Sequence, residues 1–332
     1  MIPHRNRAAL LEQALVSLDR QQLSPGVDLD VVVVDNGSSD ESLEVAASHG
    51  ARAVELGRNL GVSRALNVGI AASRGEWVAL LNNDVRLAPD WLARLLRAAA
   101  DHRSWFATGR VYDASRPHLL DGAGDAVCRG GVAWRLGHGK PDSSGSDRVR
   151  PTFFPSATAS LFRREFFERA GMFDEDFFAY LEDVEVGLRA ASLGLAGVYE
   201  PQALAWHEGS ATAGRWSDAV VGWMTRHQIL ILAKHYSQAM LLRFGQPVLV
   251  AQVLWALMAI SRGRAGAWLS GLRSGLADSS QLWRAEVRSG EAALVAALLA
   301  SESEIAEVQG TCGWDNWWKW YFRLARPRLQ AL

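Results

Sequence analysis

The feature that most constrains the fold is the regular alternation of strand and helix patterns over residues 1–110. Leu29 to Val34 is a continuous apolar run rich in β-branched side chains, as expected of a strand buried on both faces. Apolar side chains recur before it at helical spacing, at Ala8, Leu11, Leu15 and Leu18. This alternation predicts an α/β fold, with a mixed, mainly parallel, Rossmann-like sheet and flanking helices.

The other elements of this half follow in order. We expect helices over 41–49, 61–73 and 90–100, and strands over 53–56 and 77–81. Met1-Ile2-Pro3 resembles the last step of a strand whose earlier residues are missing, because such a sheet should open with a strand of about five residues. Residues 1–110 are therefore interpreted as a nucleotide-binding half.

A second half follows a segment of different composition. Tyr112 to Arg150 is rich in Gly, Asp and Ser, which is typical of a mobile loop over a site or of an ordinary surface excursion. Beyond it we expect a strand over 157–162, helices over 164–169 and 181–193, and an apolar stretch over 196–205 with a turn at Pro201. We expect this second half, residues 111–217, to complete the site, so that one domain covers residues 1–217.

The pattern is helical over residues 218–332. Val248 to Ile260 is apolar but shorter than the roughly 20 residues that a membrane span requires. An aromatic cluster interleaved with Lys319 and Arg323 follows, formed by Trp314, Trp317, Trp318, Trp320 and Tyr321. This mixture favours a helix that lies on a membrane surface. The alternative is a pair of helices packed on the catalytic domain or on a partner subunit.

Charge and cysteine content restrict the class of protein. The formal net charge of -1 gives no electrostatic reason to expect a nucleic-acid binder. The two cysteines, Cys128 and Cys312, fit neither a disulfide framework nor a zinc motif. The N-terminus shows no charged leader followed by an apolar run. We therefore expect a cytoplasmic protein, peripheral on the inner face of the cell membrane.

Polar residues end two of the predicted strands. Asn82-Asn83-Asp84 follows the strand over 77–81, and Asp35-Asn36-Gly37 follows the buried run that ends at Val34. Ligands of open α/β sheets bind outside the carboxyl ends of the strands. Asp84 is the best candidate ligand for a divalent cation, and Asp35 could accept the imide hydrogen of a pyrimidine base. Both residues could equally be turn formers or helix caps.

Two carboxylates start the predicted helix over 181–193. Glu182 and Asp183 follow an aromatic segment, Phe173 to Tyr180, and apolar neighbours raise the pKa of a carboxylate. Such a group suits general-base catalysis on a hydroxyl, although acids also start helices because they complement the helix dipole. His207, after the apolar stretch over 196–205, could complete a metal shell begun by Asp84 or be merely structural.

Six segments in this order resemble the family-2 glycosyltransferases of GT-A fold. They are Pro3-His4-Arg5-Asn6-Arg7, Val34-Asp35-Asn36-Gly37-Ser38-Ser39-Asp40, Asn59-Leu60-Gly61 with Asn67-Val68-Gly69-Ile70, Leu81-Asn82-Asn83-Asp84, Phe173-Asp174-Glu175 with Tyr180-Leu181-Glu182-Asp183, and Trp206-His207. The resemblance covers residues 1–235. Within that family, the segments are most similar to those of the bacterial rhamnosyltransferase-like and galactofuranosyltransferase-like members.

The resemblance implies a role for each matching residue. Asp183 would deprotonate the acceptor hydroxyl, with Glu182 beside it. Asp84, His207 and Asn82 would hold a divalent metal, Mn²⁺ or Mg²⁺, although Asn82 replaces the first acid of the family's metal motif. The nucleotide-sugar contacts would be Pro3, Asn6, Asp35, Asn36, Asn59, Gly61, Asn67, Asn83 and Arg226.

The implied reaction is a single displacement with inversion at the anomeric carbon. The donor would be a nucleoside-diphosphate sugar, with deoxythymidine diphosphate rhamnose as the first choice, and the acceptor a glycan or a lipid-linked molecule of the cell envelope. A membrane surface and a second copy of the chain are further candidate partners. A sugar nucleotidyltransferase is the alternative enzyme, but Pro3-His4-Arg5-Asn6 has none of the glycines of its phosphate loop. A non-catalytic, membrane-surface scaffold of the same fold is the other alternative.

Overall fold

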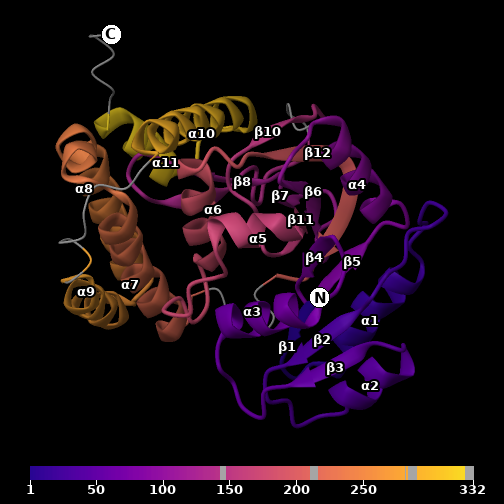
Figure 1. Cartoon of the computed structure of the whole chain (residues 1–332). Coiled ribbons are helices and arrows are strands. Elements are labelled where there is room, and N and C mark those ends of the chain that lie inside the picture. Colours follow the sequence, from indigo (N-terminus) through magenta and orange to yellow (C-terminus); the bar gives the residue numbers. More distant parts are fainter. Residues whose placement is uncertain (143–146, 210–215, 281, 283–289, 326–332) are drawn as a thin grey trace.

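A computed structural model describes residues 1–142, 147–209, 216–280, 282 and 290–325 (Figure 1). The N-terminal part is a parallel three-stranded sheet in the order β1-β2-β3. Its strands are β1 (Ile2–His4), β2 (Val32–Asp35) and β3 (Arg52–Glu55), and its helices are α1 (Ala8–Asp19), α2 (Ser42–Ser48) and α3 (Val62–Ala72). The amide of Leu81 in β4 (Trp77–Leu81) donates to the carbonyl of Met1 at 3.1 Å, so the start of the chain links this sheet to the second one.

The second sheet has the order β10-β12-β6-β11-β4, with β5 paired to β12 and β7 to β6. It is mixed, as predicted, but it is not mainly parallel, because every pairing except that of β12 with β6 is antiparallel. The strands not yet introduced are β5 (Val85–Leu87), β6 (Phe106–Asp113), β7 (Leu120–Gly122), β10 (Arg150–Thr152), β11 (Ala159–Arg163) and β12 (Gly197–His207). β12 runs parallel to β6 and continues through Pro201, where a turn is predicted, with only a shift of register between Glu200 and Leu204. This shift lets β12 continue to His207 alongside Val85.

Helices cover both faces of the sheets. One core cluster joins α1 and α4 (Trp91–Asp101) to the strands, and another joins α3, α5 (Arg164–Ala170) and α6 (Glu182–Ser192) to the opposite side. Trp91 and Phe166 are completely buried in these clusters. The predicted strands and helices of residues 1–110 and 153–207 are thus present, with boundaries that differ by a few residues.

The C-terminal part is helical, as predicted, with α7 (Asp218–His235), α8 (Gln238–Ser261), α9 (Ala265–Ser279), α10 (Glu291–Cys312) and α11 (Asn316–Leu324). α7, α8 and α10 share a core cluster with α6. The apolar run over 248–260 belongs to the 24-residue α8, so this helix is longer than the sequence pattern suggested. α8 is also the one helix among the described residues that is long and apolar enough to cross a membrane.

The aromatic cluster of α11 only partly reaches the surface. Trp318 and Tyr321 are buried, and Trp318 lies 5.7 Å from the ring of Trp134. Trp314 and Trp320 are 42% and 47% exposed. Packing on the catalytic domain, the alternative interpretation, is therefore the one that holds for Trp318 and Tyr321.

The expectation of a mobile loop over Tyr112 to Arg150 is wrong for the described residues of this segment. It contains β7, β8 (Asp125–Val127) and β9 (Ala133–Arg135), and every residue from Asp121 to Gly130 is buried. Its glycines allow close packing instead of mobility. At Gly130, a Cβ atom would lie 2.6 Å from Ala251 Cβ and 2.8 Å from the carbonyl oxygen of Pro247.

A buried ion pair fastens this segment to the helical region. Arg129 donates to Glu302 of α10 from Nε at 2.9 Å and from NH2 at 2.6 Å, and its backbone amide donates to the same carboxylate at 2.7 Å. Tyr321 adds a hydrogen bond to Glu302 at 2.9 Å. Removal of one member would leave the other charge buried without its partner.

We therefore predict that Glu302→Ala lowers the free energy of unfolding by about 3–5 kcal/mol, because Arg129 stays buried without its counter-ion. Urea denaturation followed by circular dichroism measures this. Glu307, exposed on the same helix, supplies the matched control. Glu307→Ala should change stability by no more than about 0.5 kcal/mol. Equal effects of the two substitutions would show that the pair does not anchor α10.

Candidate active site

Asp84 and His207 meet at the carboxyl ends of their strands. Asp84 lies between β4 and β5, and His207 is the last residue of β12, where it pairs in register with Val85. His207 Nε2 is 3.2 Å from Asp84 Oδ1, and both side chains are buried. The two residues that the sequence analysis proposed as metal ligands, far apart in the chain, thus lie side by side.

The second ring nitrogen of His207 is held by Asp121, a residue that the sequence analysis did not single out. Asp121 Oδ2 lies 2.9 Å from His207 Nδ1 and also accepts from Arg135 NH1 at 2.5 Å. Burial alone would lower the pKa of His207, but its hydrogen bonds to Asp121 and Asp84 outweigh burial and raise the pKa to about 9. Without a cation, the imidazole therefore carries a proton between two carboxylates at neutral pH.

The Asp84–His207 pair fits part of a metal shell. Oxygen and imidazole nitrogen suit Mn²⁺, and a ligating histidine commonly donates its other N–H to a carboxylate, as His207 can to Asp121. No cluster of three or more His, Cys, Asp or Glu side chains suited to a metal exists among the described residues. The protein donors therefore fit a cation whose remaining ligands come from water and a diphosphate, the usual arrangement for Mg²⁺. Asn82, whose backbone amide donates to Thr158 O at 2.9 Å, adjoins this pair in the chain.

Glu182 and Asp183 begin α6 in different surroundings. Asp183 is half-buried and accepts hydrogen bonds from the amides of Ala157 at 3.1 Å and Val184 at 2.9 Å. Burial raises the pKa of Asp183, while the Ala157 amide and the charge of Arg135 oppose the rise. Burial and the neighbouring Asp183 charge raise the pKa of Glu182 to about 8, and Glu182 Oε2 has no hydrogen-bond partner among the described residues. Glu182 therefore keeps its proton at neutral pH, and Asp183 is the better base.

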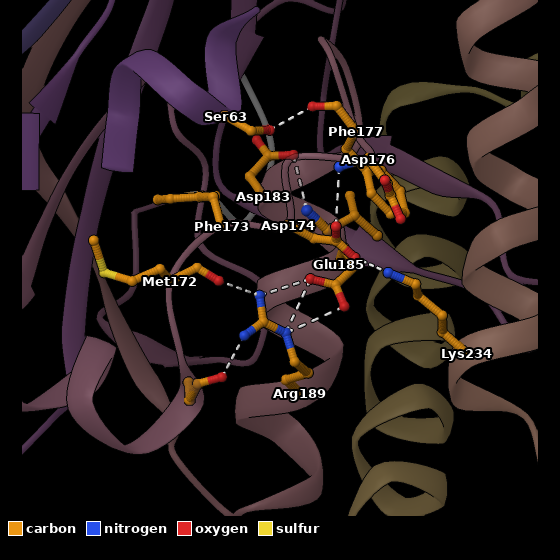
Figure 2. A network of polar contacts seen from close by, with 12 residues as sticks. Ser63, Met172, Phe173, Asp174, Asp176, Phe177, Asp183, Glu185, Arg189 and Lys234 are labelled. Carbon is orange, nitrogen blue, oxygen red and sulfur yellow. Dashed lines mark hydrogen bonds and ion pairs between the residues drawn. The ribbon is translucent and has the colours of Figure 1, made fainter. Parts of the chain in front are cut away.

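The segment that leads into α6 is held by neighbouring helices (Figure 2). Arg189, which is paired with Glu185, donates to the carbonyl of Met172 at 2.7 Å. Lys234 of α7 pairs with Asp174, and Ser63 of α3 donates to the carbonyl of Phe177. Together these contacts fix the position of the segment before Asp183.

Backbone strain marks the last two residues before α6. Tyr180 and Leu181 have φ angles of 70° and 65°, in the left-handed region that residues with side chains seldom occupy. His227 Nδ1 lies 2.8 Å from the carbonyl oxygen of Tyr180, and Phe178 stacks near Trp223 with ring centroids 5.2 Å apart. Strain of this kind persists only where surrounding contacts enforce it, and it concentrates at functional sites.

Three of the residues proposed to contact the nucleotide, Pro3, Asn6 and Asp35, lie near the turn that follows β2. Asp35 is buried at the end of β2 and accepts from the Ser38 amide at 3.1 Å, which is the turn-forming role considered from sequence. Asn6 accepts from the Ser39 amide at 2.9 Å, so it fixes the same turn. Pro3 lies in β1 opposite Val34. The contacts of Pro3, Asn6 and Asp35 with a nucleotide stay predictions.

Several of the proposed nucleotide-sugar contacts are asparagines that bind the protein itself. Asn36 donates to Gly61 O at 3.0 Å and accepts from the Leu60 amide at 2.7 Å, while Asn59 Oδ1 accepts from the Gly61 amide at 3.1 Å. Gly61 has φ 91°, and a Cβ atom there would lie 2.7 Å from Phe178 O. These residues therefore bring the loop before α3 against the loop before α6.

The last three candidates are also held within the chain. Asn67 exchanges hydrogen bonds with the backbone of Phe173 at 2.8 and 2.9 Å. Asn83 Nδ2 lies 2.8 Å from His4 Nδ1. Arg226 pairs with Asp278 at 2.7 Å and donates to Asp176 O at 2.6 Å. A diphosphate contact by Arg226 would require these two interactions to be exchanged, and it stays a prediction.

Arg135 is the other residue that the sequence analysis missed. From β9 it reaches Asp121, Thr158 Oγ1 at 2.8 Å and Asp125 at 3.5 Å. Burial opposes its charge, but Asp121, Asp125 and Asp183 hold the pKa of Arg135 above its usual range. The one local signal was the spacing of two acids around glycines in Asp121-Gly122-Ala123-Gly124-Asp125. Its meaning depends on pairing with distant residues.

The pKa of His207 generates a prediction for metal binding. A cation must displace the proton on His207 below pH 9, so Mn²⁺ affinity should rise about tenfold per pH unit from pH 6.5 towards pH 9 and then level off. Isothermal titration with Mn²⁺, which needs no turnover, measures this. An affinity independent of pH over this range would exclude His207 as a ligand.

Asp121→Asn extends the same measurement. Loss of the anionic partner should move the levelling-off to lower pH and weaken Mn²⁺ binding at pH 9 by about 10–100-fold. Asp101, exposed at the end of α4, supplies the control, and Asp101→Asn should behave as the unsubstituted chain.

Comparisons with known proteins bear on the family and the fold of this chain. Residues 1–171 match the model of the family described as glycosyl transferase family 2. The N-acetylglucosaminyl-diphospho-decaprenol L-rhamnosyltransferase of Mycobacterium tuberculosis is 32% identical over 234 residues, which covers 62% of this chain and 74% of the relative.

Two solved structures have a similar GT-A fold. The mannosyltransferase PcManGT from Pyrobaculum calidifontis, in complex with GDP-Man and Mn²⁺, aligns with a TM-score of 0.52 at 19% identity, over 98% of this chain and 84% of its own. GalNAc-T7 with UDP, GalNAc and Mn²⁺ aligns with a TM-score of 0.58 at 13% identity, over 83% of this chain and 55% of its own. The family match extends over more than half of the residues, so this chain belongs to glycosyl transferase family 2.

Proposed function

We propose that this glycosyltransferase is inverting, and that it moves rhamnose or a related sugar from a nucleoside-diphosphate sugar to a glycan or lipid-linked acceptor in cell-envelope polysaccharide synthesis. One observation carries the proposal. The amide of Ala157 donates to Asp183, and the carbonyl of the next residue, Thr158, accepts from the amide of Asn82. Two consecutive residues therefore connect the candidate base with the segment that leads to Asp84.

The proposed step is a single displacement. The acceptor hydroxyl oxygen forms a bond to the anomeric carbon while Asp183 takes its proton, and the bond between that carbon and the diphosphate oxygen breaks with its electron pair leaving on the diphosphate. Attack on the face opposite the leaving group inverts the configuration. Positioning and charge stabilisation of the leaving group supply most of the acceleration in this scheme.

The surroundings of each residue support these roles. Two amides orient the Asp183 carboxylate, and the charge of Arg135 favours its ionised form, as a base requires. Asp84 and His207 would hold Mn²⁺ or Mg²⁺ with Asn82 nearby. When bound, the metal neutralises charge on the departing diphosphate. Asp35, Pro3 and Asn6 would contact the base, and Asn36, Asn59, Gly61, Asn67, Asn83 and Arg226 would line or support the donor site.

The finer choice of substrates rests on the Mycobacterium tuberculosis relative, whose name describes transfer of L-rhamnose to a decaprenol-linked diphospho-sugar. A rhamnosyl donor and a polyprenol-linked acceptor are accordingly the first choices for this chain. A polyprenol chain stays in a bilayer, so the enzyme that uses it must reach the membrane surface. We place the protein in the cytoplasm, peripheral on the inner face of the membrane.

Asp183→Asn tests the assignment of the base. This substitution keeps the shape of the side chain but removes its ability to accept a proton, so we expect transfer to fall at least about 10³-fold while nucleotide binding changes little. Single-turnover transfer and isothermal titration with the nucleoside diphosphate measure the two effects. Asp176, exposed in the same segment, is the control. Substantial turnover by Asp183→Asn would remove Asp183 from its role.

A screen of nucleotide sugars tests the donor. In thermal-shift measurements with and without Mn²⁺, we expect deoxythymidine diphosphate rhamnose to raise the melting temperature most, and the rise to require the metal. A ligand that binds only the native state stabilises it by an amount that grows with the logarithm of its concentration relative to its Kd. Stabilisation by a different sugar nucleotide would correct the donor, and the absence of any stabilisation would contradict the proposed donor site.

A further inference from the structure

One face of α8 exposes a continuous apolar stripe. Leu242, Leu249, Val253, Leu257 and Ile260 recur at spacings of three, four and seven residues, which places them on one side of a helix. Leu242 is 88% exposed and Leu249 66%. Isolated exposed leucines are normal on protein surfaces, but an aligned row over five turns marks an interaction site.

The opposite face of the same helix is packed on the protein. Met240, Phe244, Pro247, Ala251, Trp255 and Ala259 are buried. Trp255 Nε1 donates to Thr225 Oγ1 of α7 at 2.9 Å, and Pro247 contacts the position of Gly130 in the catalytic domain. Lipid therefore cannot surround α8 in this arrangement. The helix is long enough to cross a membrane, but only one of its sides is exposed and could contact lipid.

α9 continues the exposed surface. Leu269 and Leu276, seven residues apart, are 39% and 53% exposed. α8 and α9 stand together at one edge of the molecule, on the side away from α1 and α2 (Figure 1). We call the exposed residues of these two helices the α8–α9 face.

Exposed arginines outnumber acids on this face, where Asp278 near the end of α9 is exposed and pairs with Arg226. Between Asp218 and Asp278 the sequence contains no Asp or Glu, whereas it contains Arg226, Lys234, Arg243, Arg262, Arg264 and Arg273. Arg243, Arg262 and Arg273 are exposed and lie on α8, directly after it and on α9. α8 contains no acid, and a helix with apolar side chains on one side and arginines beside them complements an anionic lipid surface.

We propose that the α8–α9 face docks on the surface of an anionic lipid bilayer, with the leucine stripe in the headgroup and acyl boundary and the arginines at the lipid phosphates. The sequence pattern predicts a membrane contact at the tryptophans in and before α11, whereas this proposal assigns the contact to α8 and α9. Only the use of this contact to reach a lipid-linked acceptor rests on the proposed function.

The packing of α9 connects the face to the catalytic centre. α9 lies against α7 so closely that a Cβ atom at Gly271 would be 2.3 Å from Gly222 O, and one at Gly275 would be 3.0 Å from Arg226 O. α7 in turn holds the segment before Asp183 through His227 and Lys234. A docked α8–α9 face would therefore fix the orientation of the catalytic site relative to the bilayer.

Vesicle flotation with the full chain tests the proposal. We expect binding to vesicles of phosphatidylcholine with about one third phosphatidylglycerol to be at least about tenfold stronger than to phosphatidylcholine alone, and to weaken with added salt. Leu249→Glu combined with Leu257→Glu should reduce binding at least tenfold. The control combines Leu193→Glu with Val149→Glu, at side chains that are 50% and 43% exposed on the catalytic domain, and should bind as the unsubstituted chain.

Further measurements separate the outcomes. Unchanged melting temperature and nucleoside diphosphate binding establish that the double variant is folded. Asp183→Asn should bind vesicles normally, so a failure of the proposed catalytic role leaves this test intact. Equal vesicle binding by the double variant and the unsubstituted chain would overturn the proposal. So would absent vesicle binding together with a dimer, in sedimentation velocity, that Leu249→Glu with Leu257→Glu dissociates, because the occupant would then be a second copy.

Discussion

The guanidinium of Arg135 compensates the charge of an unusually acidic interior. Asp121 and Asp125 lie within ion-pair distance of Arg135, and the charge of Arg135 lowers the pKa of Asp183 against the effect of burial. Through Asp121 the same arginine acts on His207, and through Thr158 it contacts the strand junction beside Ala157. Ionised carboxylates can remain buried only when paired, so the proposed base and the proposed metal residues both depend on this one cation.

Much of the scaffold was readable from sequence because it follows local periodicity. The predicted strand over 77–81 is β4, and the predicted helix over 181–193 is α6 with one fewer residue at each end. Asp84 and His207 could be proposed because both follow apolar strands, and strand ends gather at one edge of a sheet. Their contact, over a separation of more than a hundred residues, agrees with that reasoning.

The segment between Tyr112 and Arg150 defeated the same reasoning. Its strands are only three residues long, too short for periodicity to reveal. Glycine-rich composition predicts mobility, whereas Gly122, Gly130 and Gly131 allow close packing here. Asp121 and Arg135 could not be recognised because their role arises from tertiary pairing with His207 and with each other. The burial of Trp318 could not be predicted for a related reason, since composition does not show which tryptophan faces Trp134.

The Arg129–Glu302 pair has a consequence for the modularity of this protein. Arg129 lies on the connection between β8 and β9, six positions before Arg135, so the residue that attaches α10 and the residue that pairs with Asp121 and Asp125 occupy one short stretch of chain. The helical region therefore helps to hold in place the segment that carries Arg135. A chimera that takes its helical region from a relative would also need the relative's segment between β8 and β9, because the two are joined by a buried ion pair.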